Sequence, residues 1–170
     1  MSIEVFFYMA ASVAIIASIN VVTAQNTVHA LLYLVVSLLA VAVCFYLMGA
    51  PFAAGLEVIV YAGAILVLFV FAIMMFGLGK DETLNAPQVK TYSVWFGPVL
   101  LSLALLAELL YIIADTGMQT QLQAQVVSAK EVGQLLYGPY LLVVEISSFL
   151  LLVGLISAYH YAKPEERGES

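Results

Sequence analysis

The chain has 170 residues, of which 64% are hydrophobic and only 9% are charged. A soluble domain carries roughly 25% charged residues, so this chain has too few polar side chains to cover a water-exposed surface. Its formal net charge is −6, and its five basic residues form no cluster, which excludes nucleic-acid binding through a basic patch. The single cysteine, Cys44, can form neither an intrachain disulfide nor a metal site by itself. We therefore expect an integral membrane protein without a separate soluble domain.

Five apolar segments, each long enough to cross a bilayer, follow one another along the chain. We therefore expect an all-α membrane protein with five transmembrane helices, forming a single integral membrane domain over residues 1–170. The first segment lacks the basic n-region and the small-x-small cleavage site of a signal peptide, so we interpret it as a retained helix. The helices are predicted near residues 3–23, 27–48, 53–76, 92–114 and 137–161, with polar loops at 77–91 and 115–136.

The first two breaks between helices are short and carry recognisable end signals. Asn26 is suited to be the N-cap of the second helix. Gly49 is suited to end that helix, and Pro51 fits the first turn of the next one. These signals predict tight connections between the first three helices.

The last polar loop contains two conflicting local patterns. Glutamines alternate with other residues over 119–126, and this period of two favours a short surface strand. Ser128 and Glu131 form an S-x-x-E capping box, which predicts a helical turn leading into the fifth helix. Gly138 and Pro139 are expected to loosen or restart that helix at the membrane edge.

The basic residues also predict the orientation. With five spans, the first loop, the third loop and the C-terminal tail share one side of the membrane. That side holds four of the five basic residues, and the other side holds only Lys130. The positive-inside rule then places the C-terminus in the cytoplasm and the N-terminus outside. The four residues are Lys80, Lys90, Lys163 and Arg167.

Three carboxylates, Glu57, Glu108 and Glu145, fall inside the apolar segments. An ionised acid at bilayer depth costs at least about 2.5 kcal/mol, so such residues usually face protein or water and often have a function. The alternative is that each side chain reaches the interface, or is protonated in a helix contact. We favour this alternative for Glu108, and a functional role for Glu57 and Glu145.

The third segment differs from the others in its polar and small residues. Glu57 and Tyr61 are four residues apart and share one helix face. Gly63 lies near the middle between two alanines, where another helix or a water molecule can approach the backbone. Close helix packing, which small residues favour in lipid, is the competing interpretation, and spacing alone favours it. No motif for a metal, a phosphate or a catalytic triad is present, and the sequence predicts no cofactor in this chain.

Three blocks of sequence are distinctive: Asn26–Leu34, Leu56–Ile65 and Tyr137–Tyr140, the last followed by Glu145 and Leu150–Leu152. They resemble the J-subunit family of proton-pumping NADH:quinone oxidoreductase, which corresponds to the mitochondrial chain-6 family of respiratory complex I. The resemblance covers essentially the whole chain, and the block in the third segment is its most specific part. One departure is Thr27, where relatives often have proline.

This resemblance implies a role in a larger enzyme. The chain would be a multi-pass subunit of the cell inner membrane, with the same orientation as the charge count predicts and no redox centre of its own. FMN, iron–sulfur clusters, NADH and quinone would belong to other subunits of the complex. Its partners would be other membrane subunits, notably A, H, K and N, together with lipid and, indirectly, the peripheral arm.

The family also implies a mechanism in the third helix. A π-bulge near Tyr61, Gly63 and Val67, with Glu57 nearby, would switch to regular α-helix and so open or close a hydrated proton path that couples quinone reduction to proton translocation. Glu145 would belong to the same path. Glu108 matches no family signature. Two alternatives stay open: a purely structural scaffold, and the equivalent subunit of a related sodium/proton antiporter or membrane hydrogenase.

Overall fold

The computed structural model describes residues 3–24, 26–76, 91–115 and 126–162, and in these ranges every regular element is a helix. The chain divides into two compact units, Met1–Val127 and Ser128–Ser170. The alternating glutamines for which a strand was predicted lie almost entirely outside the described residues, and Val126, the last residue of that stretch, is not in a strand.

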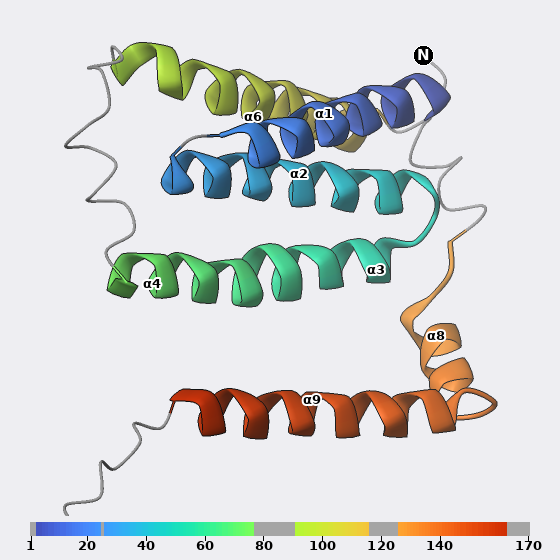
Figure 1. Ribbon diagram of the computed structural model, residues 1–170. Coiled ribbons are helices and arrows are strands. Elements are labelled where there is room, and N and C mark those ends of the chain that lie inside the picture. The colour runs from blue at the N-terminus through green and yellow to red at the C-terminus, as the bar shows by residue number, and fades with distance from the viewer. Residues whose placement is uncertain (1–2, 25, 77–90, 116–125, 163–170) are drawn as a thin grey trace, which may run out of the picture. The chain divides into compact units, whose positions relative to one another are not determined.

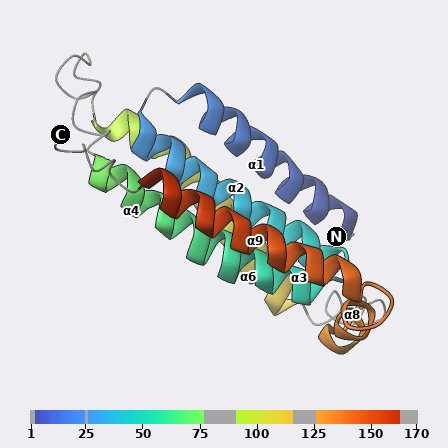
Figure 2. The same ribbon diagram turned by 60° about the horizontal axis from the view of Figure 1, so that its bottom comes forward.

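The first unit is built around α2 (Thr27–Leu47). This helix packs against α1 (Ile3–Thr23), against the third span and against α6 (Thr91–Ala114), and α1 also contacts α6. Figures 1 and 2 show α2 lying between α1 and the third span. The third span is a continuous helix in three parts, listed here in chain order: α3 (Pro51–Leu56), η1 (Glu57–Ile65) and α4 (Leu66–Phe76).

The predicted end signals are confirmed at both ends of α2. The Asn26 side chain accepts hydrogen bonds from the backbone N–H groups of Val28 and His29, at 2.9 and 3.3 Å, as an N-cap does. After α2 the chain turns through Gly49, whose φ of 80° lies in the left-handed region that favours glycine. Pro51 then occupies the first turn of α3, where a proline needs no backbone hydrogen.

Small side chains bring α1 and α2 close together. Ala10, Ala17 and Ala40 have no exposed surface. The hydroxyl groups of Ser18 and Ser37 lie 2.8 Å apart in a hydrogen bond, and the Ser37 hydroxyl also lies 3.3 Å from the Ala14 carbonyl. Contacts of this kind hold helices together in lipid, where burial of apolar surface between helices supplies little net driving force.

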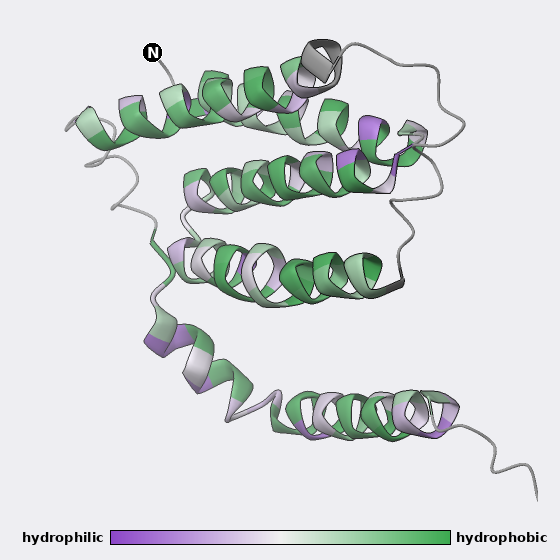
Figure 3. Ribbon diagram, turned by 90° about the vertical axis from the view of Figure 1, so that its left-hand side faces the viewer, coloured by the Kyte–Doolittle hydropathy of each residue, from purple (hydrophilic) through white to green (hydrophobic). Residues whose placement is uncertain are grey.

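The second unit consists of α8 (Ala129–Leu136) and α9 (Leu141–Ala162). The predicted capping box is present, since the Ser128 hydroxyl accepts from the Glu131 N–H and the Glu131 carboxylate accepts from the Ser128 N–H. In Figure 3 α8 carries both hydrophilic and hydrophobic residues, whereas α9 is mostly hydrophobic. The fifth helix therefore begins at Leu141 rather than near residue 137, because Pro139 disfavours helical geometry at Gly138 and cannot donate a backbone hydrogen bond.

Five helices in the described part of the chain are long and apolar enough to cross a membrane. Their bounds agree with the predicted segments to within a few residues, and the fifth differs most for the reason just given. The five are Ile3–Thr23, Thr27–Leu47, Pro51–Met75, Trp95–Ala114 and Leu141–Ala162.

Candidate functional site in the third span

The third span contains a π-helix, η1, between two α-helical ends. The backbone N–H of Leu66 donates to the carbonyl of Tyr61, five residues earlier, instead of to the residue four positions earlier. Such π segments are rare, and they occur frequently at functional sites because their hydrogen-bond geometry is less favourable than that of an α-helix. Among the described residues of the first unit, the third span therefore has the most unusual backbone.

Gly63 lies inside η1 and fits its geometry. A Cβ atom at this position would lie 3.1 Å from the Val58 carbonyl oxygen, which is five residues earlier in the chain. This distance is shorter than an ordinary van der Waals contact, and the neighbour is backbone that cannot rotate away. Apart from the adjacent turns of its own helix, a Cβ at Gly55 in α3 would meet nothing within 4 Å. A Cβ at position 63 would thus crowd the backbone of η1, which would have to shift by a few tenths of an ångström to accept it.

The residues expected from the sequence are distributed along this span. Glu57 is the first residue of η1 and is partly buried, and Tyr61 is 53% exposed one turn later. No hydrogen bond joins these two described side chains. Val67 is 46% exposed and lies in α4, two residues beyond η1. The acid and the phenol are therefore available to groups outside this unit.

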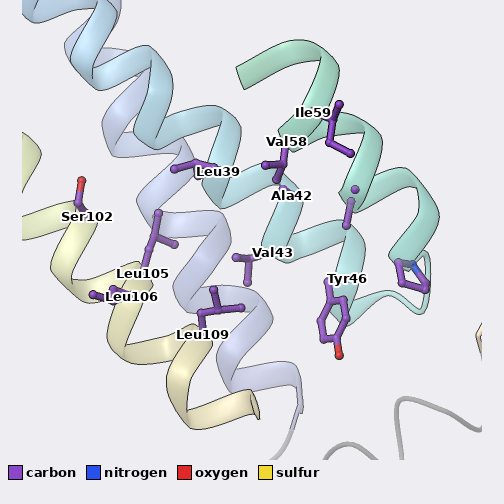
Figure 4. Close-up of a pocket in the computed structure, with 13 residues that line it drawn as sticks. Leu39, Ala42, Val43, Tyr46, Val58, Ile59, Ser102, Leu105, Leu106 and Leu109 are labelled. Atoms are coloured by element: carbon purple, nitrogen blue, oxygen red, sulfur yellow. The ribbon is translucent and has the colours of Figure 1, made fainter. Parts of the chain in front are cut away.

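An apolar groove of about 600 Å³ separates the third span from α6, with α2 as its floor (Figure 4). Val58 and Ile59 bring one edge of η1 to this groove. Neither Glu57 nor Glu108 lines it, so the groove contains no carboxylate. Its lining residues are Leu39, Ala42, Val43, Tyr46, Pro51, Ala54, Gly55, Val58, Ile59, Ser102, Leu105, Leu106 and Leu109.

Comparison with known proteins gives a consistent result. Residues 17–160 match the model of the family described as NADH-ubiquinone/plastoquinone oxidoreductase chain 6. Among curated relatives, NADH-quinone oxidoreductase subunit J of Pseudomonas aeruginosa is 50% identical over 164 residues, covering 96% of this chain and 99% of the relative. The protein of the same description from Escherichia coli K12 is 47% identical over 166 residues, covering 98% of this chain and 90% of the relative.

This chain belongs to the chain 6 family. The blocks that carried the resemblance in the sequence coincide with particular structural elements. Asn26–Leu34 forms the capped start of α2, and Leu56–Ile65 forms the end of α3 and the whole of η1.

Glu145, the remaining expected site residue of this chain 6 member, lies in the second unit. It is exposed near the start of α9, and its backbone carbonyl accepts a hydrogen bond of 2.7 Å from the Ser148 hydroxyl. Within the residues that the structure describes, no group of three or more His, Cys, Asp or Glu side chains is placed to hold a metal ion.

Glu108, in α6, is the buried acidic side chain among the residues that the structure describes. It is only 3% exposed, in a helix whose other buried positions are apolar. Leu105, Glu108 and Ile112 are spaced three and four residues apart on one face of α6, and all three are buried. Two positions were expected for Glu108, at the membrane interface or in a helix contact, and the structure has the second.

Proposed function

We propose that this chain is the J-type membrane subunit of a proton-translocating NADH:quinone oxidoreductase, a multi-pass protein of the cell inner membrane. Its N-terminus lies outside and its C-terminus in the cytoplasm in this proposal. The observation that carries it is the π-helix η1 in a chain that matches the chain 6 family over residues 17–160. A scaffold with five ordinary spans would have no need for a π-helix of nine residues.

The proposed chain performs no bond chemistry. NADH, FMN, iron–sulfur clusters and quinone belong to other subunits, and this chain responds to the changes of charge and contact that quinone reduction produces. Only 6% of the most apolar window of Pro51–Met75 is buried within the chain. The third span therefore offers most of its surface to other molecules, and we assign these neighbours to lipid and to the A, H, K and N membrane subunits.

The third span acts as a gate in this proposal. It alternates between the π register and a regular α-helix, and each register turns different side chains towards a hydrated proton path. Glu57 and Tyr61 supply polar groups to this path, Gly63 makes the π register accessible, and Val67 controls its width just after η1. Glu145 contributes a further carboxylate from α9.

Membership of the complex is tested by extracting membranes with a mild detergent and separating them on a native gel stained for NADH dehydrogenase activity. The active band is then analysed by mass spectrometry. We expect this chain in the active band. Its absence from that band would overturn the proposal, and its presence in a sodium/proton antiporter or a hydrogenase would support the alternative assembly.

A further inference from the structure

Glu108 lies in a seam between α6 and the other two helices of its bundle. Three residues before it, Leu105 packs in a cluster with residues of α1 and α2, among them Ala17 and Ala40. Four residues after it, Ile112 packs in a second cluster with Phe6 of α1 and Leu47 of α2. The Glu108 side chain thus lies between two apolar clusters, on the face of α6 that both helices cover. The members of this seam on α6 are Leu105, Glu108 and Ile112.

The carboxyl group of Glu108 has an oxygen that is buried without a partner. Its Oε1 atom has less than 1 Å² of accessible surface and no hydrogen bond. A buried charge needs an opposite charge or several hydrogen bonds to offset its lost hydration. The described helices that pack against this face, α1 and α2, contain no lysine or arginine, and neither does α6.

The titratable groups of α2 do not supply a compensating charge. Cys44 is the one within electrostatic range of Glu108, and a thiol carries no positive charge in either of its forms. His29 is fifteen residues from Cys44, which corresponds to about 22 Å along the helix. Tyr46 lines the apolar groove, and Tyr33 lies near the start of the helix, close to the first turns of α6.

The titratable groups of α1 and α6 likewise supply no positive charge near Glu108. Glu4 and Tyr8 are exposed on α1, away from the seam. On α6 itself, the ring of Tyr111 stacks on Phe6 at a centroid distance of 5.1 Å, and Asp115 lies at the end of the helix. None of these groups is a cation, so an ionised Glu108 would be a single uncompensated negative charge among apolar side chains.

We infer that Glu108 is a proton-binding site inside the seam of α1, α2 and α6. In the packed seam the carboxyl group holds a proton and is neutral. It releases this proton only when α6 separates from its neighbours or when water enters between them, because only then can the carboxylate be hydrated. This site is independent of the proposed gate in the third span and does not line the groove beside it.

The proton can be detected with carbodiimides, which react with protonated carboxyl groups. Membranes holding the assembled complex are treated with apolar dicyclohexylcarbodiimide or with a water-soluble carbodiimide, and the stable acylurea adducts are mapped by mass spectrometry. We expect the apolar reagent to label Glu108 at least roughly tenfold more than the exposed Glu131 at neutral pH. We expect the water-soluble reagent to leave Glu108 unlabelled. Equal labelling of the two residues by either reagent would overturn the proposal.

A second measurement does not depend on access of the reagent. Glu108→Gln replaces the protonated acid with a neutral group of almost the same shape. A hydrated carboxyl group ionises above about pH 4.3, so at pH 6 the carboxyl group is ionised in the separated seam but protonated in the packed seam. The wild-type complex should therefore have a lower temperature of thermal inactivation than the Gln complex at pH 6, and this difference should widen as pH rises until the packed seam also loses its proton. If the difference in inactivation temperature between the wild-type and Gln complexes did not change with pH, the inference would be overturned.

Discussion

The most direct test of the proposed gate is a substitution that adds a single carbon atom at Gly63. In Gly63→Ala the new Cβ would lie 3.1 Å from the Val58 carbonyl oxygen, so the backbone of η1 would have to shift by a few tenths of an ångström. Overpacking of this kind costs about 1–3 kcal/mol. At about 1 kcal/mol for alanine, the π register would become roughly fivefold less populated relative to the α register. Gly63→Val adds two more carbons on a stiff branched side chain and should reach the upper end of the range.

The assay compares proton pumping with electron input in inverted membrane vesicles. NADH-driven acidification of the vesicle interior is measured with a pH-sensitive dye, and NADH oxidation by an artificial acceptor measures the peripheral arm alone. We expect Gly63→Val to reduce pumping strongly, Gly63→Ala to reduce it less, and neither to change the reaction with the artificial acceptor. Gly55→Ala and Gly55→Val are the matched controls, because a Cβ at Gly55 meets nothing within 4 Å apart from the adjacent turns of its own helix.

Two results would refute this reasoning in different ways. Normal pumping by an assembled Gly63→Val complex would show that the π register is not required, as the scaffold interpretation expects. Equal loss of pumping in the Gly55 controls would show that the third span tolerates no added bulk anywhere. The effect would then come from contacts with neighbouring subunits rather than from the register of η1.

Three further substitutions test the fold around this site. Gly49→Ala should destabilise the turn after α2 by about 1–2 kcal/mol, because Gly49 has a φ of 80°, and a lower temperature of thermal inactivation would show it. Gly97→Ala should cost less than about 1 kcal/mol, since the new Cβ would collide only with the end of the Tyr33 side chain, which can move aside, and Tyr33→Phe should remove most of this cost in a double-mutant cycle. Ser128→Ala should remove the cap of α8 at a cost of about 1 kcal/mol, and hydrogen exchange of the α8 amides should accelerate about fivefold.

The number of membrane-length helices and their ends followed from the sequence because hydropathy and local capping determine them. Asn26, Gly49 and Pro51 each act through their own side chain or backbone conformation, so no distant contact is needed to interpret them. The start of the fifth helix was misplaced because the apolar segment continues through a turn that Pro139 enforces. Local chemistry was thus sufficient wherever a single residue controls the backbone.

The π-helix and the burial of Glu108 could not be derived in the same way. An extra residue per turn changes the hydrophobic pattern of a uniformly apolar span very little, so periodicity gives no signal for η1. Gly63 permits the π register without requiring it, and only the family resemblance placed a bulge there. For Glu108, the decisive fact is which helices cover one face of α6, and this depends on the packing of α1 and α2.

The position of Val67 outside η1 is consistent with a role in the proposed switch. A π segment is equivalent to an insertion of residues into an α-helix, so a change to regular α-helix must rotate one end of the span by about 100° for each inserted residue. The α3 end is held by the turn at Gly49 and by its packing on α2, the helix next to it in Figure 1. It is therefore α4 that must rotate about the helix axis, and its first turn contains Val67. A change of register within Glu57–Ile65 would thus turn different side chains of α4 towards the neighbouring subunits, although α4 itself is a regular α-helix.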